Sequence, residues 1–257
     1  LTVDPTTQTF EAIRSGQVWK TGTNYATVHD AAYGSSSTWG DVSIRQFGQR
    51  YTGTDYIIWR AVLRWDTSSI PDGADFSSGK ICLMDEEGSD LSDTDFIVRI
   101  QKWTEGSDDF SIYDYDAFDG VNYDDGGFST SSWQQNVYNN ITLSNLDVVN
   151  KVGYTEVMVR SSRDISSTEP TGYELVAFTD HRYAAQLLEV TYIENYSPTI
   201  GEFEAPNTIY AFQEVMVNSS IRDDDGNITL KNASLTLSVD NVVLKWINST
   251  NTFSMDD

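Results

Sequence analysis

Residues 56–85 carry the pattern that most constrains the fold of this chain, because apolar side chains recur there at every second position. A Pro-Asp-Gly turn at 71–73 separates two alternating runs, and in the second run we expect Ile81 and Leu83 to point inward and Cys82 to lie on the opposite face. Such alternation predicts β-strands that cover a hydrophobic core. The predicted core face of the first run consists of Ile57, Trp59, Ala61, Leu63 and Trp65.

The same alternation recurs through most of the chain. No apolar stripe of helical period is longer than two turns, although 146–153 predicts one short helical turn. Many short strands joined by polar turns predict an all-β protein, either a sandwich or a barrel. The further predicted strands are in segments 94–103, 138–146, 154–164, 173–180 and 185–194.

The pattern changes after Tyr192, where a proline-containing stretch reads as a linker. Alternation then resumes in the manner of an immunoglobulin-like sandwich, which usually takes about 100 residues. We therefore predict two domains, a β-sandwich at 1–194 and an incomplete immunoglobulin-like β module at 195–257. The second module is either truncated here or completed by another chain.

The charge of the chain disfavours one class of partner. There are 39 acidic and 16 basic residues, a net charge of −23, so nucleic-acid phosphates would be repelled. The acidity suits a soluble surface protein, a cation-binding protein or a protein of salty water. No run of eighteen apolar residues occurs, so no membrane span is expected in this chain. The lone Cys82 predicts no intramolecular disulfide.

Six Asn-x-Ser/Thr sequons bear on where the protein is located. One reading is chance in a segment rich in Asn, Ser and Thr, and the other is a glycosylated exterior surface. The second reading predicts an extracellular or cell-surface glycoprotein. The candidate glycosylation sites are Asn140, Asn195, Asn218, Asn227, Asn232 and Asn248.

Residues 111–133 combine closely spaced acids with aromatic side chains. Carboxylates in such a loop could supply the oxygen ligands of Ca²⁺, although the spacing is not that of an EF-hand. The alternative is a solvated acidic loop, and no other cofactor is expected. The candidate calcium ligands are Asp114, Asp116, Asp119, Asp124 and Asp125.

Aromatic residues beside predicted loops suggest a glycan-binding surface. Flat aromatic faces stack on the apolar side of pyranose rings, while polar groups bind the hydroxyls. The alternative for each is packing in the core, which we expect for Trp59 and Trp65. The glycan-binding candidates are Trp39, Trp103, Tyr113, Tyr115 and Trp133.

Catalytic motifs are not apparent in the sequence. His29 and His181 lie in no nucleophile or metal motif, and with 39 acids any chosen carboxylate pair is uninformative. We therefore predict that the protein is not an enzyme. A polysaccharide lyase or hydrolase remains an alternative.

The stretch 60–83 resembles the central signature of DNRLRE domains, which are secreted jelly-roll sandwiches related to carbohydrate-binding modules. Segments 161–166, 169–178 and 187–192 also resemble the last strands of that family, so that the resemblance covers 8–193. The resemblance implies that 1–194 is an antiparallel jelly-roll β-sandwich, that it serves glycan binding or adhesion, and that it belongs to an archaeal, bacterial or virion surface. The matching positions are Arg60, Trp65 in place of a Phe, Asp66, Thr67, Ser68, Ile70, Pro71, Gly73 and Ala74.

A second resemblance concerns 197–237, which is similar to the opening of immunoglobulin-like or PKD-like repeats of surface proteins and implies a spacer or stalk. Together these features predict a non-catalytic extracellular protein for adhesion or glycan binding. The alternative is a structural subunit of a filament, sheath or virion fibre, assembled by strand complementation. The expected partners are a surface glycan or other copies of the chain.

Overall fold

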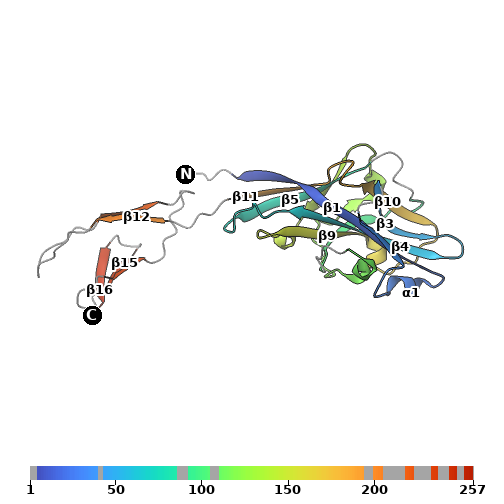
Figure 1. Ribbon diagram of the computed structural model, residues 1–257, viewed down its shortest axis with the longest axis horizontal. Helices are drawn as coiled ribbons and strands as arrows, with labels where there is room; N and C mark the ends of the chain where they lie inside the picture. The colour runs from blue at the N-terminus through green and yellow to red at the C-terminus, as the bar shows by residue number, and fades with distance from the viewer. Residues whose placement is uncertain are drawn as a thin grey trace, which may run out of the picture. The chain divides into compact units, whose positions relative to one another are not determined.

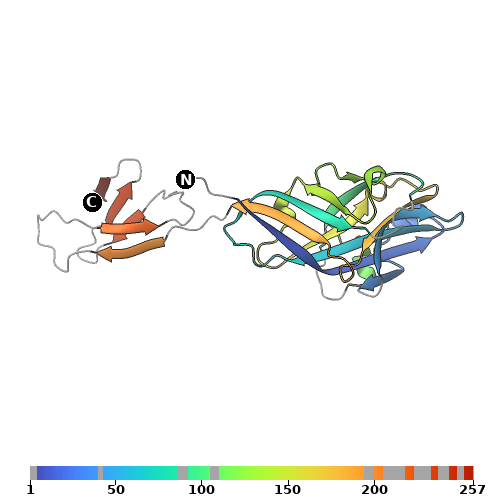
Figure 2. The same cartoon turned by 90° about the horizontal axis from the view of Figure 1, so that it is seen from above.

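The computed structural model describes residues 5–39, 43–85, 92–104 and 110–193, and five strands of the following segment. Residues 5–193 form one compact unit, and the strands after residue 194 belong to a second. Both units consist of antiparallel β-strands, as Figures 1 and 2 show. The all-β fold class predicted from the sequence is confirmed.

Eight strands of the first unit form the two sheets of a jelly roll. One sheet has the order β1-β11-β5-β8 and the other the order β4-β9-β6-β7. Numbered along the chain, these are strands one, eight, three, six and strands two, seven, four, five, which is jelly-roll connectivity. The strands are β1 (Thr6–Gly22), β4 (Tyr56–Asp66), β5 (Asp75–Met84), β6 (Ile97–Lys102), β7 (Phe128–Ser129), β8 (Tyr138–Leu143), β9 (Tyr154–Ser161) and β11 (Leu187–Ile193).

The long strand β1 belongs to both sheets. Its first half, from Thr6 to Glu11, pairs with β11, and its second half pairs with β4. The register shifts between Ala12 and Arg14, where the strand passes from one sheet to the other. Three further strands extend the β4 sheet, namely β2 (Ser36–Trp39), β3 (Ile44–Tyr51) and β10 (Tyr173–Thr179).

The main core lies between the two sheets. The predicted inward residues Ala61, Leu63 and Trp65 of β4 are fully buried there, with Ile81 and Leu83 of β5. The outer part of the same face, Ile57 and Trp59, packs in a small separate cluster with Leu175. Cys82 is buried as a free thiol outside both clusters.

The other face of β4 is also covered, which the alternation did not predict. A second apolar layer packs on it, formed by short helical segments rather than by another sheet. Helix α1 (Tyr25–His29) and the 3-10 helix η1 (Ile112–Asp116) supply part of this layer. The second layer buries Val18, Tyr25, Val28, Ile58, Val62, Trp103, Phe110, Tyr115, Ala117 and Met158.

Helices are short throughout the described residues. Helix α2 (Ser162–Ile165) follows β9, and the 3-10 helices η2 (Thr130–Ser132) and η3 (Leu146–Val148) lie in loops. The helix η3 confirms the short turn predicted within 146–153. Among the residues described, no helix is long and apolar enough to span a membrane.

The second unit contains two small antiparallel sheets. Strands β12 (Thr199–Glu204) and β13 (Asn218–Arg222) pair in one sheet. Strands β14 (Ala233–Thr236), β15 (Val243–Ile247) and β16 (Thr252–Asp256) form the other. The sequons at Asn195, Asn227, Asn232 and Asn248 lie outside the described residues, and of Asn218 only its position at the start of β13 is described.

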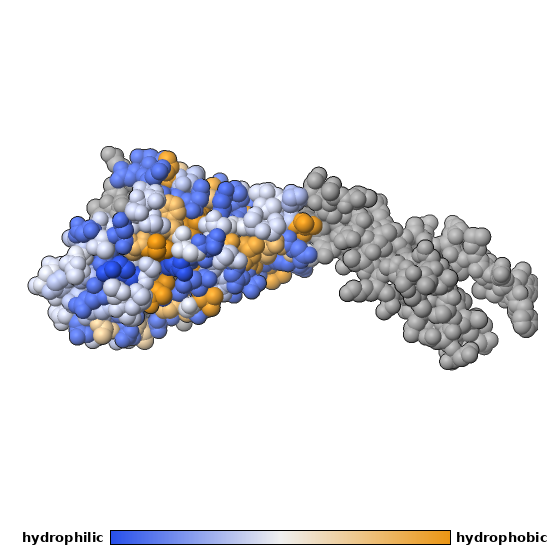
Figure 3. All heavy atoms as spheres, turned by 180° about the vertical axis from the view of Figure 1, so that it is seen from behind, coloured by the Kyte–Doolittle hydropathy of each residue, from blue (hydrophilic) through white to orange (hydrophobic). Residues whose placement is uncertain are grey.

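The surface of the first unit is mixed in character. Figure 3 shows one face, on which small groups of apolar side chains alternate with hydrophilic ones.

Candidate binding surface

Two tyrosines protrude side by side from loops that cover the second face of β4. Tyr33 lies between α1 and β2, Tyr113 lies in η1, and their side chains are 52% and 66% exposed. Their ring centroids are 6.3 Å apart and their planes are inclined by 58°. We call this exposed pair the tyrosine pair. Large aromatic faces open to solvent are typical of ligand contacts.

The loops that carry the tyrosine pair are bonded to each other and to β1. The backbone N–H of Gly34 donates to the carbonyl oxygen of Ile112 at 2.7 Å, and Ser35 N–H donates to the carbonyl of Trp19, also at 2.7 Å. A capping box between Ser111 and Asp114 begins η1. Backbone bonds therefore hold the two tyrosines at a defined separation.

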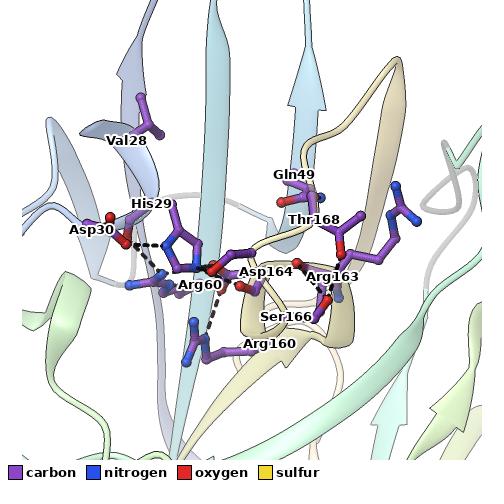
Figure 4. Close-up of polar contacts among 12 residues, drawn as sticks. Val28, His29, Asp30, Gln49, Arg60, Arg160, Arg163, Asp164, Ser166 and Thr168 are labelled. Atoms are coloured by element: carbon purple, nitrogen blue, oxygen red, sulfur yellow. Dashed lines mark hydrogen bonds and ion pairs between the residues drawn. The ribbon is translucent and has the colours of Figure 1, made fainter. Parts of the chain in front are cut away.

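Arg60 of β4 bonds to both loops, and Figure 4 shows it beside His29 and Asp164. Its Nη1 donates to the carbonyl oxygen of Tyr115 at 2.6 Å, and its Nη2 lies 3.4 Å from the carbonyl oxygen of His29. The Tyr115 hydroxyl in turn donates to the carbonyl of Val28 at 2.9 Å. One guanidinium, itself stacked 4.1 Å from the Tyr115 ring centroid, thus connects η1 with the end of α1.

Asp164 of α2 balances the charge of the buried arginines (Figure 4). Its two carboxylate oxygens accept from Nε and Nη2 of Arg60 at 3.0 and 2.9 Å, and one also accepts from Nε of Arg160 at 2.8 Å. Arg160 donates further to Gln101 at 2.8 Å. We call Arg60, Arg160 and Asp164 the buried charge cluster.

The buried charge cluster changes the pKa of its carboxyl group. Burial of Asp164 opposes the charged form, but the positive charges and hydrogen bonds of Arg60 and Arg160 outweigh that effect. They hold the pKa of Asp164 well below its usual value. Burial raises the pKa of the nearby Tyr115 hydroxyl above its ordinary value. Asp164 is therefore ionised throughout the physiological range.

A second set of contacts fastens α1 to the neighbouring strands. The Tyr25 hydroxyl donates to Oε1 of Gln49 at 3.1 Å, and Gln49 Nε2 donates to Glu174 at 2.7 Å. Arg163 Nε donates to the same Glu174 oxygen at 2.7 Å. The imidazole nitrogens of His29 lie 2.7 Å from the carbonyl oxygen of Asp164 and 2.5 Å from Asp30. The tyrosine pair therefore stands on a support bonded on several sides.

Three of the five predicted glycan-binding aromatics have their rings inside the protein. Trp103, Tyr115 and Trp133 are buried, and the indole N–H groups of Trp103 and Trp133 donate to Asp114 and Asp85. These three are corrected to core residues, because apolar burial outweighs their position beside loops. Trp39 is partly buried and stacks on Phe110.

Tyr113 is the one of the five predicted aromatics that is mostly exposed, and the sequence did not predict its partner Tyr33. Tyr33 stands alone in a stretch of small and polar residues, 80 positions before Tyr113. The available signal was an isolated tyrosine in a Gly/Ser-rich loop, and this signal does not indicate which residue lies beside that tyrosine in the fold.

The predicted calcium ligands are not brought together. Asp114 caps η1, while Asp124 accepts from the backbone of Ile100 and pairs with Arg99 at 2.9 Å. Asp119 accepts from the hydroxyl of Tyr123 at 2.7 Å. Asp116 and Asp125 are exposed. In the described part of the chain, no three His, Cys, Asp or Glu side chains are grouped to hold a metal, so the predicted calcium site is not formed by these residues.

A Ser-His-Asp contact elsewhere resembles a catalytic arrangement only in composition. The buried Ser15 Oγ donates to Asp180 at 2.7 Å and lies 3.0 Å from Nδ1 of His181. Ser15 also accepts from Arg45 at 3.2 Å. In a catalytic triad the serine proton goes to the imidazole, which the carboxylate orients. Here the carboxylate accepts it directly, so the cluster links β1, β3 and the loop after β10.

Asn140 is the predicted glycosylation site that lies within the first unit. It sits on β8, which pairs with β5 on one side, and its side chain is exposed between the buried Asn139 and Ile141. Thr142, the third residue of the sequon, is exposed on the same face. The folded strand therefore leaves room for a glycan at this asparagine.

The residues behind the resemblance to DNRLRE domains have structural contacts. Arg60 anchors the loops, Thr67 Oγ1 donates to the carbonyl of Asn150 at 2.6 Å, and Ala74 N–H donates to Pro71 at 2.9 Å. A scan against protein-family models and a search of curated proteins find no match to this chain.

Proposed function

We propose that this protein is a non-catalytic extracellular surface protein, of the DNRLRE type, that binds glycans through the tyrosine pair. The observation that carries the proposal is the pair itself, two exposed rings 6.3 Å apart on loops tied to the buried charge cluster. Rings already held in place lose little conformational freedom on binding, which favours affinity. Pyranose rings offer the apolar C–H faces that such rings accept.

The extracellular part of the proposal is supported by the sequons. The exposed Asn140 and Thr142 on β8 suit a glycan attached to the folded protein. A sugar there would also cover part of a sheet edge, which protects edge strands against unwanted pairing.

A glycan array with single variants tests the proposal. We expect wild-type protein to bind one class of glycan, and Tyr33→Ala and Tyr113→Ala each to weaken it by roughly tenfold, since an aromatic contact is worth about 1 kcal/mol or more. Tyr183→Ala is the matched control, because Tyr183 is 63% exposed outside the tyrosine pair. Binding that survives both substitutions, or no binding to any glycan, would reject the proposal.

A structural role is the second candidate. The described strands of the second unit form sheets of two and three strands, and such small sheets leave edges that a strand from another chain can extend. Electron microscopy of the native material tests this role, since a repeating polymer is expected. An enzymatic role would instead release reducing or unsaturated ends from polysaccharides, which a colorimetric screen detects.

A further inference from the structure

The outer face of the β1-β11-β5-β8 sheet carries a strip of apolar side chains. Alternation along β5 points its core residues inward and places Cys82 and Met84 on the outer face. Leu187 of β11 pairs with Cys82, and Tyr138 of β8 pairs with Met84. Tyr138 is 37% exposed, and Met84 and Leu187 are partly exposed. We call these four residues the outer strip. Neighbouring apolar side chains at a surface are typical of a contact that another group covers.

Asn140 lies beside the outer strip, and its side-chain amide is free. Alternation along β8 places Tyr138, Asn140 and Thr142 on the same outer face. The neighbouring Asn139 is buried, where it accepts from the N–H of Gln134 at 2.9 Å and donates to the carbonyl oxygen of the same residue, also at 2.9 Å. In the part of the chain that the structure describes, no hydrogen bond holds the side chain of Asn140 or that of Thr142. The amide of Asn140 is therefore available for modification.

We propose that Asn140 carries an N-linked glycan whose first sugar packs on the Tyr138 ring and covers the outer strip. The two residues are two positions apart in one strand, so their Cα atoms are separated by roughly 7 Å on the same face. This spacing lets a pyranose ring on the amide nitrogen lie over the phenol ring, which accepts its apolar C–H face. The inference rests on the extracellular location proposed above, and it adds the modified residue and the side chain that receives the sugar.

The modification takes its sugar from a lipid-linked oligosaccharide diphosphate through a transferase of the cell. The amide nitrogen of Asn140 attacks the anomeric carbon of the first sugar, where a C–N bond forms and the C–O bond to the diphosphate breaks. The amide loses one proton, and the lipid diphosphate leaves with the bonding electrons. The free hydroxyl of Thr142 completes the sequon that such a transferase recognises.

The glycan at Asn140 and the tyrosine pair lie on opposite sides of the sandwich. The tyrosine pair stands on loops that cover the second face of β4, in one sheet, whereas the outer strip lies on the outer face of the other sheet. The attached sugar therefore leaves the tyrosine pair open. Modification of Asn140 and binding by the tyrosine pair can be measured separately.

Glycopeptide mass spectrometry of the full chain, secreted by a host that attaches N-glycans, tests the modification. We expect a glycan on Asn140 in the wild type and its loss in Thr142→Ala. Thr142→Ser is the matched control, because it keeps the sequon and should keep the glycan. An unmodified Asn140 in the wild type overturns the inference.

Thermal unfolding followed by tryptophan fluorescence tests the packing on Tyr138, since every tryptophan except Trp246 belongs to the first unit. The gain is the Tm of the wild type minus that of Thr142→Ala, corrected by the same difference in protein made without glycans. We expect a gain of about 2–4 °C that remains when an endoglycosidase trims each glycan to its first sugar. Tyr138→Ala should abolish the gain, whereas Tyr154→Ala, at a tyrosine 46% exposed on the other sheet, should keep it. No gain in the wild type, or an equal gain in Tyr138→Ala, overturns the packing.

The outcomes separate the inference from the proposed function. Thr142→Ala should bind the glycan array as the wild type does, because Asn140 is remote from the tyrosine pair. An occupied Asn140 in a protein that binds no glycan supports the inference and rejects glycan binding as the function. An unmodified Asn140 in a protein that binds through Tyr33 does the reverse.

Discussion

Asp164 supports the tyrosine pair indirectly, because it compensates the charge of Arg60, which anchors the loops, and that of the neighbouring buried Arg160. Replacing it by Asn leaves Arg60 and Arg160 buried without a counter-charge. We expect Asp164→Asn to lower the free energy of unfolding by about 3–5 kcal/mol, measured by urea denaturation. Glu189→Gln is the control, because its ion pair with Lys80 is partly exposed and is worth under about 1 kcal/mol.

The same carboxylate predicts how stability responds to acid. Because the folded-state pKa of Asp164 lies below its unfolded value of about 4, its contribution is complete above that value and is lost as the pH falls toward the folded pKa. Urea denaturation between about pH 5 and pH 2 should therefore show a steeper loss of stability in the wild type than in Asp164→Asn. Parallel curves for the two proteins would contradict this assignment.

Single residues also mark the limit of what the sequence predicts. The many aromatic residues of its loop made Tyr113 a predicted binding residue. The sequence did not show that Tyr113 is exposed whereas Tyr115, two positions away, is buried. The burial of the two side chains differs because Tyr115 points toward Arg60, while Tyr113 points to solvent. Arg60 is one of the positions that carry the resemblance to DNRLRE domains, but its role in anchoring two loops depends on partners more than 30 and 50 residues distant along the chain.

Among the elements, β4 illustrates which part of a pattern can be predicted. Alternation predicted its core face correctly, because period two follows from strand geometry alone. The second apolar layer was not predicted, since α1 and η1 span five residues each and are too short to show a helical stripe. An arginine on the second face of a strand is expected in solvent, and Arg60 is buried only because these short elements cover it.

The loop before β2 offers a test at the level of elements. At Gly34 a Cβ would lie 2.7 Å from a methyl of Val18 and 2.9 Å from the carbonyl of Trp19, so Gly34→Ala must push the loop outward. We expect severalfold weaker glycan binding by calorimetry, because Tyr33 moves away from Tyr113, while most of the fold is kept. Gly153→Ala is the control, with its nearest neighbour at 3.4 Å, and unchanged binding by Gly34→Ala would count against the tyrosine pair.

For the first unit, the sequence predicted seven strands from residue 56 onward, but it predicted neither β1, β2, β3 and β7 nor the partner of any strand. Each alternating run indicates that one face of its strand is buried, but it does not indicate which strand lies beside it. The jelly-roll order came from a resemblance, and the pairing of β1 with β11, about 180 residues apart in the chain, became visible only in the structure. That pairing joins the beginning and the end of the unit, so that its sheets are completed within residues 5–193.

A fragment of residues 5–193 is therefore expected to fold alone and to bind glycan as the full chain does. It holds all eight jelly-roll strands, both apolar layers, the buried charge cluster and the tyrosine pair. Thermal unfolding followed by circular dichroism should give one cooperative transition. A fragment of 5–186 should fail to fold, because without β11 the first half of β1 and strand β5 both lose their common partner. If 5–193 were unfolded, or if 5–186 folded equally well, closure by β11 would not be what completes this sandwich.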